Sequence, residues 1–234
     1  MNKVALITGG ARGIGRAVAD LLLARGWSVI ATGATDEEVA ASPPTENLTL
    51  AQLDVTDQES VDRLVSGQDR LDALVNCAGV NRRLDEYDLA VFEQVIAINL
   101  TGTMRMCIAC HPLLKAPGGT VVNIASMYSF FGAPLSPAYA ASKGGVAQLT
   151  KSLAVRWADD GIRVNAIAPG WIETAMTRPL LQDTARVEAI LARTPLKRWG
   201  QPDDVARVIG ILLSDDTAFM TGTIVPVDGG YSIM

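Results

Sequence analysis

The chain has 234 residues, of which 49% are hydrophobic, and a net charge of −5. This length and composition are ordinary for one large globular domain with its own core. No basic cluster is longer than two residues, which argues against nucleic acid or an anionic membrane as the main partner. No apolar run approaches the ~20 residues of a transmembrane helix, and the apolar stretch after Met1 is too short for a signal peptide, so we expect a cytoplasmic protein.

Short apolar segments alternate with helical segments along the whole chain. The predicted strands cover residues 3–8, 27–32, 48–53, 71–76, 119–125, 162–168 and 223–227. The predicted helices cover residues 16–25, a segment from about 58, residues 89–114 with an interruption near 99–102, and residues 139–159 and 202–214. This alternation, with no linker or repeat, predicts α/β architecture: a single doubly wound domain over residues 1–234 with a parallel sheet.

Functional residue types follow the ends of several predicted strands. A glycine loop, residues 9–15, lies between the first strand and the first helix, which is the context that a dinucleotide-binding loop requires. Asp54, Asn76 and Ser126 each come at or directly after a strand end, and Pro169 follows the sixth strand. Because ligands of parallel sheets bind beyond the carboxyl ends of the strands, we expect these residues to line one crevice.

The segment Tyr139-Ala-Ala-Ser-Lys143 predicts acid–base chemistry. Tyr139 and Lys143 are four residues apart, so they share one face of a helix. A phenol titrates near ~10, and a neighbouring ammonium group would lower that pKa. The hydroxyl of Ser126 could hydrogen-bond a substrate oxygen. The alternative is an ordinary helix start with a buried tyrosine and a solvated lysine, because the pattern is short.

Taken together, these motifs resemble the classical short-chain dehydrogenase/reductase family over essentially the full length of the chain. The matching stretches are Thr8-Gly-x-x-x-Gly-Ile-Gly15, Asp54-Val55, Asn76-x-Ala-Gly79, Asn99, Ser126, Tyr139-x-x-x-Lys143, Pro169-Gly-x-Ile-x-Thr174 and Val227-Asp-Gly-Gly230. Cys77 departs from the pattern, since many relatives carry a second asparagine there. The resemblance implies a Rossmann-type domain with a seven-stranded parallel sheet and a homotetrameric enzyme.

The resemblance also implies a role for each matching residue. Tyr139 would be the general acid/base, Lys143 would lower its pKa and hold the nicotinamide ribose, and Ser126 would position the substrate oxygen. Asn99 would hold open a helical kink that supports a water-linked proton path. The implied cofactor-binding residues are Gly9, Arg12, Gly13, Ile14, Gly15, Asp54, Val55, Asn76, Ala78, Gly79, Tyr139, Lys143, Pro169, Gly170, Ile172 and Thr174. No metal is expected.

The second strand bears on the choice between NADP and NAD. NAD-specific relatives close this strand with an acidic residue, and here Gly33 holds that place. Arg12 could bind a 2′-phosphate bidentately. The sequence therefore favours NADP, with NAD as the alternative, because Asp36, Glu37 and Glu38 would repel a phosphate if they turned inward.

The substrate pocket is predicted to include Arg82, Met127, Tyr128 and Trp171. The Arg82-Arg83 pair would suit a carboxylate, and its surroundings look similar to reductases of keto sugar acids. The favoured reaction is therefore interconversion of a secondary alcohol and a ketone on a small polar substrate, with a sugar or sugar acid favoured. Residues from about 176 to 194 are expected to form a substrate lid.

Three alternatives stay open or are rejected at this point. The pattern also looks like 3-oxoacyl carrier-protein reductases, in which the arginine pair would meet an acidic carrier. A dinucleotide-sensing protein is the non-enzymatic alternative, but a sensor does not need a proton shuttle. The haem-attachment pattern Cys107-Ile-Ala-Cys110-His111 is rejected because its segment is predicted to be the interior of an apolar helix. Apolar residues in helices 99–114 and 139–159 are consistent with subunit contacts.

Overall fold

A single parallel sheet organises the chain. The computed structural model describes residues 2–234. Seven strands run in the order β3-β2-β1-β4-β5-β6-β7, and every neighbouring pair is parallel. Their bounds are β1 Val4–Thr8, β2 Ser28–Gly33, β3 Leu48–Gln52, β4 Ala73–Asn76, β5 Thr120–Ile124, β6 Arg163–Pro169 and β7 Ile224–Val227. The predicted Rossmann-type α/β fold with a seven-stranded parallel sheet is thus confirmed.

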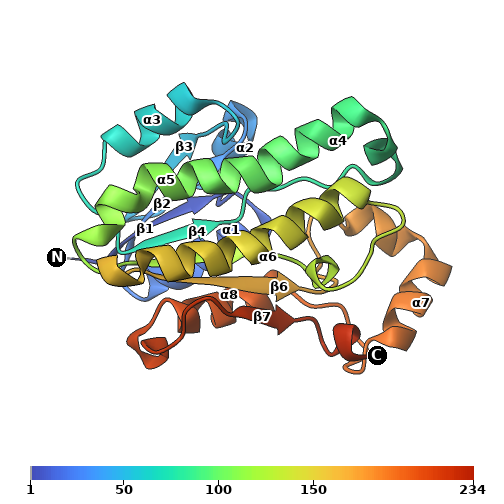
Figure 1. Cartoon of the computed structure of the whole chain (residues 1–234). Helices are drawn as coiled ribbons and strands as arrows, with labels where there is room; N and C mark the ends of the chain where they lie inside the picture. Colours follow the sequence, from blue (N-terminus) through green and yellow to red (C-terminus); the bar gives the residue numbers. More distant parts are fainter. Residues whose placement is uncertain (1) are drawn as a thin grey trace.

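Helices cover both faces of the sheet (Figure 1). On one face, α1 and α8 pack against each other and against alternate residues of the central strands. On the other face, α3, α5 and α6 bury a second apolar cluster. The helix bounds are α1 Gly13–Ala24, α2 Asp36–Ala40, α3 Gln58–Ser66, α4 Leu89–Ile96, α5 Gly102–Lys115, α6 Pro137–Trp157, α7 Thr184–Arg193 and α8 Pro202–Leu212.

Local sequence signals explain most of the element boundaries. Helix α6 begins at Pro137, two residues before the predicted start, because proline is well suited to the first position of a helix. Asp57 caps α3 as predicted, accepting hydrogen bonds from the backbone of Glu59 and Ser60. Pro226 lies in β7, an edge strand, where its missing N–H group removes no bond from the sheet interior.

The segment predicted to be a lid forms a short 3₁₀ turn, Arg178–Gln182, followed by α7. Figure 1 shows α7 at the end of the sheet towards which the strands point, close to the C-terminus. Within residues 2–234, no helix has both the length and the apolar character needed to cross a membrane.

Candidate active site

The loop between β1 and α1 needs its glycines for steric reasons. Gly9 and Gly13 have φ angles of +62° and +57°, which residues with a side chain rarely adopt. A Cβ atom at Gly15 would lie 2.3 Å from the carbonyl oxygen of Gly9, so a larger residue would displace the loop. The loop therefore keeps its backbone close to the N-terminus of α1, where N–H groups can meet phosphate.

A cavity of about 470 Å³ opens beyond the carboxyl ends of the strands, and we call it the first cavity. Its volume is typical of ligand pockets. Its lining includes all but one of the implied cofactor-binding residues. The lining residues among them are Gly9, Arg12, Gly13, Ile14, Gly15, Asp54, Val55, Ala78, Gly79, Tyr139, Lys143, Pro169, Gly170, Ile172 and Thr174. Residues from six strand ends therefore converge here, as expected from the sequence.

Asn76 is the exception. Its side chain lies in the core, where its amide donates to Asn123 Oδ1 at 2.9 Å and to Cys107 Sγ at 3.3 Å. Asn76 and Asn123 are register partners in β4 and β5, so the two amides face each other inside the sheet layer. Asn76 was implied to be a cofactor-binding residue, and this is corrected: its side chain joins two strands and does not line the first cavity.

Tyr139, Lys143 and Ser126 meet in the first cavity. Lys143 is 4% exposed, and its Nζ donates to the carbonyl oxygen of Ile124 at 2.6 Å. Nζ lies 5.7 Å from the centroid of the Tyr139 ring. Ser126 is also buried, and its hydroxyl accepts a hydrogen bond from Tyr128 N at 3.2 Å. The alternative of a solvated lysine at an ordinary helix start is therefore wrong.

The pKa of Tyr139 differs from the expectation. Burial raises the pKa of Tyr139 to about 12, and a hydrogen bond with Ser126 only partly opposes this effect. Burial also lowers the pKa of Lys143 to about 8. In this structure the expected lowering of the phenol pKa by Lys143 is not found; burial dominates, and the neighbouring Tyr128 and Glu86 also raise the pKa of Tyr139.

Asn99 lies in a π-helical turn, Ala97–Thr101, which interrupts the helical region between α4 and α5 as predicted. Its side chain is fully buried; Oδ1 accepts from Val80 N at 2.8 Å, and Nδ2 donates to Val80 O at 2.9 Å. Nδ2 also donates to Ser142 Oγ at 3.0 Å. The Asn99 side chain thus connects the loop after β4 to α6, the helix that carries Tyr139. The backbone carbonyl oxygen of Asn99 accepts a hydrogen bond from Thr103 Oγ1 at 2.8 Å.

Glu86 is a buried residue of the site that sequence reasoning missed. It is 1% exposed, and its carboxylate accepts hydrogen bonds from Arg82 N at 2.8 Å and Tyr139 N at 2.9 Å. The carboxylate therefore caps the first turn of α6 and fixes the loop before α4 against it. No motif signals this role, because Glu86 stands in an ordinary polar stretch of the sequence.

A second cavity of about 360 Å³ adjoins the first, and both are lined by Ser126 and Tyr139. Met127, Tyr128 and Trp171 line the second cavity, so the structure places them together as the sequence suggested. Arg82 lines only the first cavity, whereas Arg83 lines the second. Arg82 stays a predicted substrate residue, and the structure adds its neighbour Arg83, whose backbone has φ = +56°, to the lining of the second cavity.

Further residues of the second cavity come from distant segments. Phe131, Arg186, Arg193 and Tyr231 all line it. A sequence signal existed for the two arginines, because they are seven residues apart on α7 and so share one helix face. Their approach to Tyr128, however, depends on how α7 packs against the rest of the chain.

The far end of the first cavity holds an ion pair. Arg12 Nη2 lies 2.7 Å from Glu38 Oε1, and the Arg12 side chain is 65% exposed. Glu38 Oε2 also accepts a hydrogen bond from Ala34 N at 2.9 Å. Glu38 therefore does turn inward, and its carboxylate holds the guanidinium that was expected to meet a 2′-phosphate.

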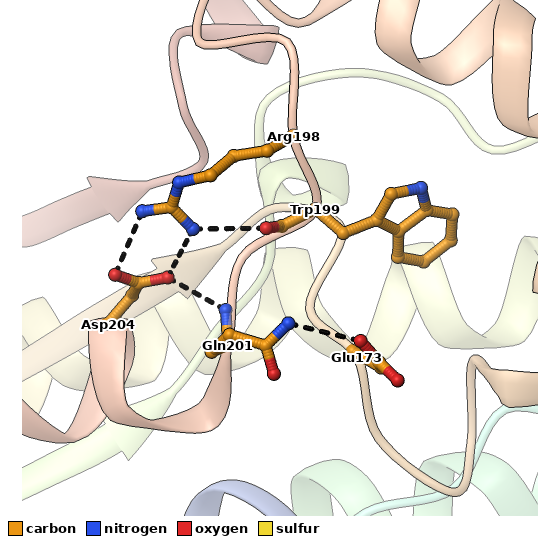
Figure 2. Close-up of polar contacts among 5 residues, drawn as sticks. All are labelled: Glu173, Arg198, Trp199, Gln201 and Asp204. Carbon is orange, nitrogen blue, oxygen red and sulfur yellow. Dashed lines mark hydrogen bonds and ion pairs between the residues drawn. The ribbon is translucent and has the colours of Figure 1, made fainter.

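A polar network fixes the segment behind the second cavity (Figure 2). Arg198 makes two hydrogen bonds to Asp204, at 2.6 and 3.0 Å, and a third to the carbonyl oxygen of Trp199. Gln201 connects this network to Glu173 at 3.0 Å. Arg198 holds the pKa of Asp204 down at about 2, so the ion pair persists at neutral pH. The network supports Trp199, which packs beneath α7.

Glycine at position 79 keeps the first cavity open where the resemblance places the dinucleotide. A Cβ atom at Gly79 would lie 3.3 Å from Asn99 Oδ1 and 3.5 Å from Lys143 Nζ, so glycine leaves the space beside these groups open. Among the described residues, no group of three or more His, Cys, Asp or Glu side chains could hold a metal ion. Cys107 and Cys110 are buried in α5, in agreement with the helix interior expected for this segment. The neighbouring His111 Nε2 lies 2.8 Å from Asp160 Oδ2.

Residues 9–232 match a family model described as enoyl-(acyl carrier protein) reductase. The chain is 40% identical to cis-4-hydroxycyclohexanecarboxylate dehydrogenase of Sinomonas cyclohexanicum, over 99% of this chain and 97% of that protein. It is 39% identical to the 3-oxoacyl-[acyl-carrier-protein] reductase of Thermotoga maritima, over 99% and 98%. It is also 38% identical to 2-dehydro-3-deoxy-D-gluconate 5-dehydrogenase of Bacillus subtilis, over 98% and 94%. Among solved structures, the crystal structure of gox2181 matches with a TM-score of 0.93 and 36% identity, covering 100% of this chain and 96% of the other.

Proposed function

The chain belongs to the classical short-chain dehydrogenase/reductase family, and from this we propose that it oxidises a secondary alcohol, or reduces the ketone, of a small polar substrate with NADP as the preferred cofactor. Its family membership makes it an NAD(P)-dependent oxidoreductase. The proposal is carried by one observation: Tyr139 and Ser126 line both cavities, so a substrate in the second can meet a dinucleotide in the first.

Tyr139 is proposed as the group that moves the proton. When held in the first cavity, a nicotinamide dinucleotide would supply the hydride chemistry that interconverts alcohol and ketone. During ketone reduction, the Tyr139 hydroxyl donates its proton to the substrate oxygen, and Ser126 holds that oxygen by a hydrogen bond. The raised pKa of Tyr139 keeps the phenol protonated at neutral pH, which favours its role as an acid.

Lys143 and Asn99 are proposed to support Tyr139 and the cofactor. Lys143 Nζ is positioned between the Ile124 carbonyl and the ring of Tyr139, where it can also donate to a ribose hydroxyl. Asn99 holds the loop at Val80 and the π-helical turn in place. The remaining lining residues of the first cavity would hold the dinucleotide, with its phosphates at the glycine loop.

The preference for NADP rests on the end of β2 and on Arg12. Gly33 provides no carboxylate at the position where NAD-specific enzymes bind the ribose 2′-hydroxyl. Arg12 lines the first cavity and is largely exposed, so a 2′-phosphate could replace Glu38 as its partner. Glu38 turns inward and occupies Arg12 with its carboxylate, and this is the observation that keeps NAD as the alternative.

A sugar or a sugar acid is the favoured substrate. The support comes from the second cavity, which combines aromatic walls with arginine side chains, and from relatives named for a hydroxycyclohexanecarboxylate and a deoxygluconate derivative. Reduction of a 3-oxoacyl carrier protein is the alternative, favoured by the similarity to the Thermotoga maritima reductase. We further propose that the 3₁₀ turn Arg178–Gln182 and α7 act as a substrate lid, since they supply one wall of the second cavity.

A substrate panel tests this function. We expect reduction of keto sugar acids with NADPH, or oxidation of hydroxycycloalkane carboxylates with NADP+, and weaker reduction of 3-oxoacyl thioesters. The measurement is the kcat/KM for each ketone with NADPH and NADH, and for each alcohol with NADP+ and NAD+, followed by absorbance of the reduced nicotinamide. A strong preference for the thioesters would replace the proposal with the carrier-protein alternative, and inactivity with every alcohol and ketone would contradict it.

A homotetramer is proposed for the assembled enzyme. Two apolar residues of the helices predicted to make subunit contacts, Met106 of α5 and Val146 of α6, lie in the core instead. Ile108 on α5 and Val155 on α6 are 58% and 82% exposed, so these two helices do present apolar side chains outward. We expect a tetrameric mass in light scattering at micromolar concentration and a smaller assembly for Val155→Glu. A monomeric mass for the unmodified protein would contradict the assignment. The cytoplasm stays the predicted location, supported by the three free cysteines.

A further inference from the structure

Three arginines line the second cavity without an acidic partner. Arg83 belongs to the loop before α4, and Arg186 and Arg193 belong to α7. All three are partly buried. Within residues 2–234, none of them makes an ion pair with Asp or Glu. Partly buried charges are costly unless they are paired, so a cluster of this kind calls for a negatively charged group.

The electrostatics show that the three guanidinium groups act on one place. Arg186, Arg83 and Arg193 all lower the pKa of Tyr128, although burial raises it more strongly. The pKa of Arg83 is lowered by burial and then by the neighbouring charge of Arg186. This mutual repulsion in the absence of an anion indicates that the arginines are close to one another.

Arg193 is held rigidly in this position. Its guanidinium carbon lies 4.4 Å from the centroid of the Tyr231 ring and 5.0 Å from that of Phe131. These two rings fix the planar group by cation–π contacts. The Nε atom of Arg193 is buried and has no hydrogen-bond partner within the described residues. A buried donor left in this way is expected to gain a partner when the cavity is filled.

Aromatic rings separate the arginines from the proposed proton donor. The ring of Tyr128 lies 6.4 Å from that of Tyr139 and 5.6 Å from that of Phe131, centroid to centroid. Arg193 in turn contacts the ring of Phe131. A substrate with its reacting carbon at Tyr139 would therefore reach the arginines only with an atom several bonds away, and an apolar wall would flank the atoms between.

We infer that Arg83, Arg186 and Arg193 bind an oxyanion of the substrate, a carboxylate or a phosphate ester, that lies several carbons away from the reacting alcohol or ketone. The inference rests on the proposed function and names its substrate class. Guanidinium groups bind both oxyanions through paired N–H donors. Because two of the arginines lie on α7 and one lies on the loop before α4, the anion would also join α7 to the body of the enzyme.

Charge-removing variants that keep the long side chain test this site. We expect Arg193→Met and Arg186→Met to raise the KM for cis-4-hydroxycyclohexanecarboxylate on the order of 10- to 100-fold, which corresponds to losing a charge-assisted hydrogen bond. The KM for the neutral methyl ester should change by less than about twofold, because uniform binding is lost only for the charged substrate. Arg63→Met is the matched control, since Arg63 is an exposed arginine of α3 that lines neither cavity.

Two comparisons decide between the outcomes. In the unmodified enzyme, the carboxylate should be preferred over its methyl ester, and 4-hydroxycyclohexyl phosphate tests whether a phosphate ester serves as well. A preference for either anion supports the site and identifies the anion's source. Equal kcat/KM values for the ester and both anions, or unchanged KM values in the variants, would overturn the inference.

A binding measurement separates this inference from the proposed function. Trp171 lines the second cavity, so tryptophan fluorescence should report on ligand binding there without any turnover. We expect cyclohexanecarboxylate, which has no hydroxyl group to oxidise, to change the fluorescence of the unmodified protein. The apparent Kd should weaken in Arg193→Met but not in Arg63→Met. If binding is retained while every alcohol fails to react, the reaction is wrong and the anion site stands; absence of binding in the unmodified protein contradicts the site itself.

Discussion

Tyr139→Phe is expected to lower kcat by about 10²- to 10⁴-fold, the usual contribution of a positioned proton donor. The substitution removes the hydroxyl that we propose exchanges a proton with the substrate oxygen at the junction of the two cavities. The backbone N–H of residue 139 still donates to Glu86, so the start of α6 should keep its structure. Thermal unfolding and the Kd for NADPH, measured by fluorescence titration, should therefore stay close to the unmodified values.

Two comparisons make this result specific. Tyr87→Phe is the matched control, because the Tyr87 hydroxyl binds the Pro134 carbonyl on an exposed surface, and its kcat should change by less than about twofold. Ser126→Ala should also lose activity, but the double variant should be only slightly worse than Tyr139→Phe, because the two groups act as one unit. Near-normal kcat in Tyr139→Phe would reject the proposed mechanism.

The pH dependence follows from the same hydroxyl. Since the pKa of Tyr139 is raised to about 12, the phenol stays protonated near neutrality and is available as an acid for ketone reduction. Alcohol oxidation needs the ionised form, whose fraction grows with pH below that pKa. The oxidation rate should therefore rise between about pH 7 and about pH 9 in the unmodified enzyme, and this rise should be absent from Tyr139→Phe.

Arg12→Ala is expected to weaken NADPH binding about 10- to 100-fold and NADH binding by less than about twofold. The loss for NADPH corresponds to about 1.5 to 3 kcal/mol, the usual value for hydrogen bonds to a charged group. NADH has no 2′-phosphate, so it should not depend on this guanidinium. The Kd of each cofactor, determined by fluorescence titration, provides the comparison, and Arg63→Ala is the control because Arg63 is exposed and lines neither cavity.

Glu38→Gln should shift the balance in the opposite direction. The substitution removes the carboxylate that now pairs with Arg12 at 2.7 Å, so NADPH should bind more tightly while NADH binding changes little. If Glu38 instead bound the ribose hydroxyls of NAD, Glu38→Gln would weaken NADH binding. That outcome, or a preference of the unmodified enzyme for NADH, would reverse the cofactor assignment.

Features that depend on neighbouring residues were predictable from the sequence. The alternation of strands and helices, the interruption at Asn99 and the glycine loop all follow from periodicity and from motif spacing. Tyr139 and Lys143 share a helix face at any position in a fold, since they are four residues apart. Most of the implied cofactor residues follow the carboxyl ends of strands. Because these ends meet at one edge of a parallel sheet, the residues line one cavity.

Features that depend on the packing of distant segments were not predictable. The sequence cannot show that Asn76 faces Asn123 across two strands, that Glu86 reaches the first turn of α6, or that the backbone at Arg83 turns away from that at Arg82. It also could not show that burial raises the pKa of Tyr139, because desolvation depends on everything that surrounds the ring.

The sequence by itself determined the fold and named the residues proposed to transfer the proton, because local periodicity and short-range spacing encode both. Only the tertiary structure decided which arginines line the second cavity. Arg83 and the two arginines of α7 are about a hundred residues apart along the chain, and they meet at the second cavity only because α7 packs over the ends of the strands. Such a meeting of like charges has no local signature, since it arises from long-range packing, and its stability depends on the anion that we infer it binds.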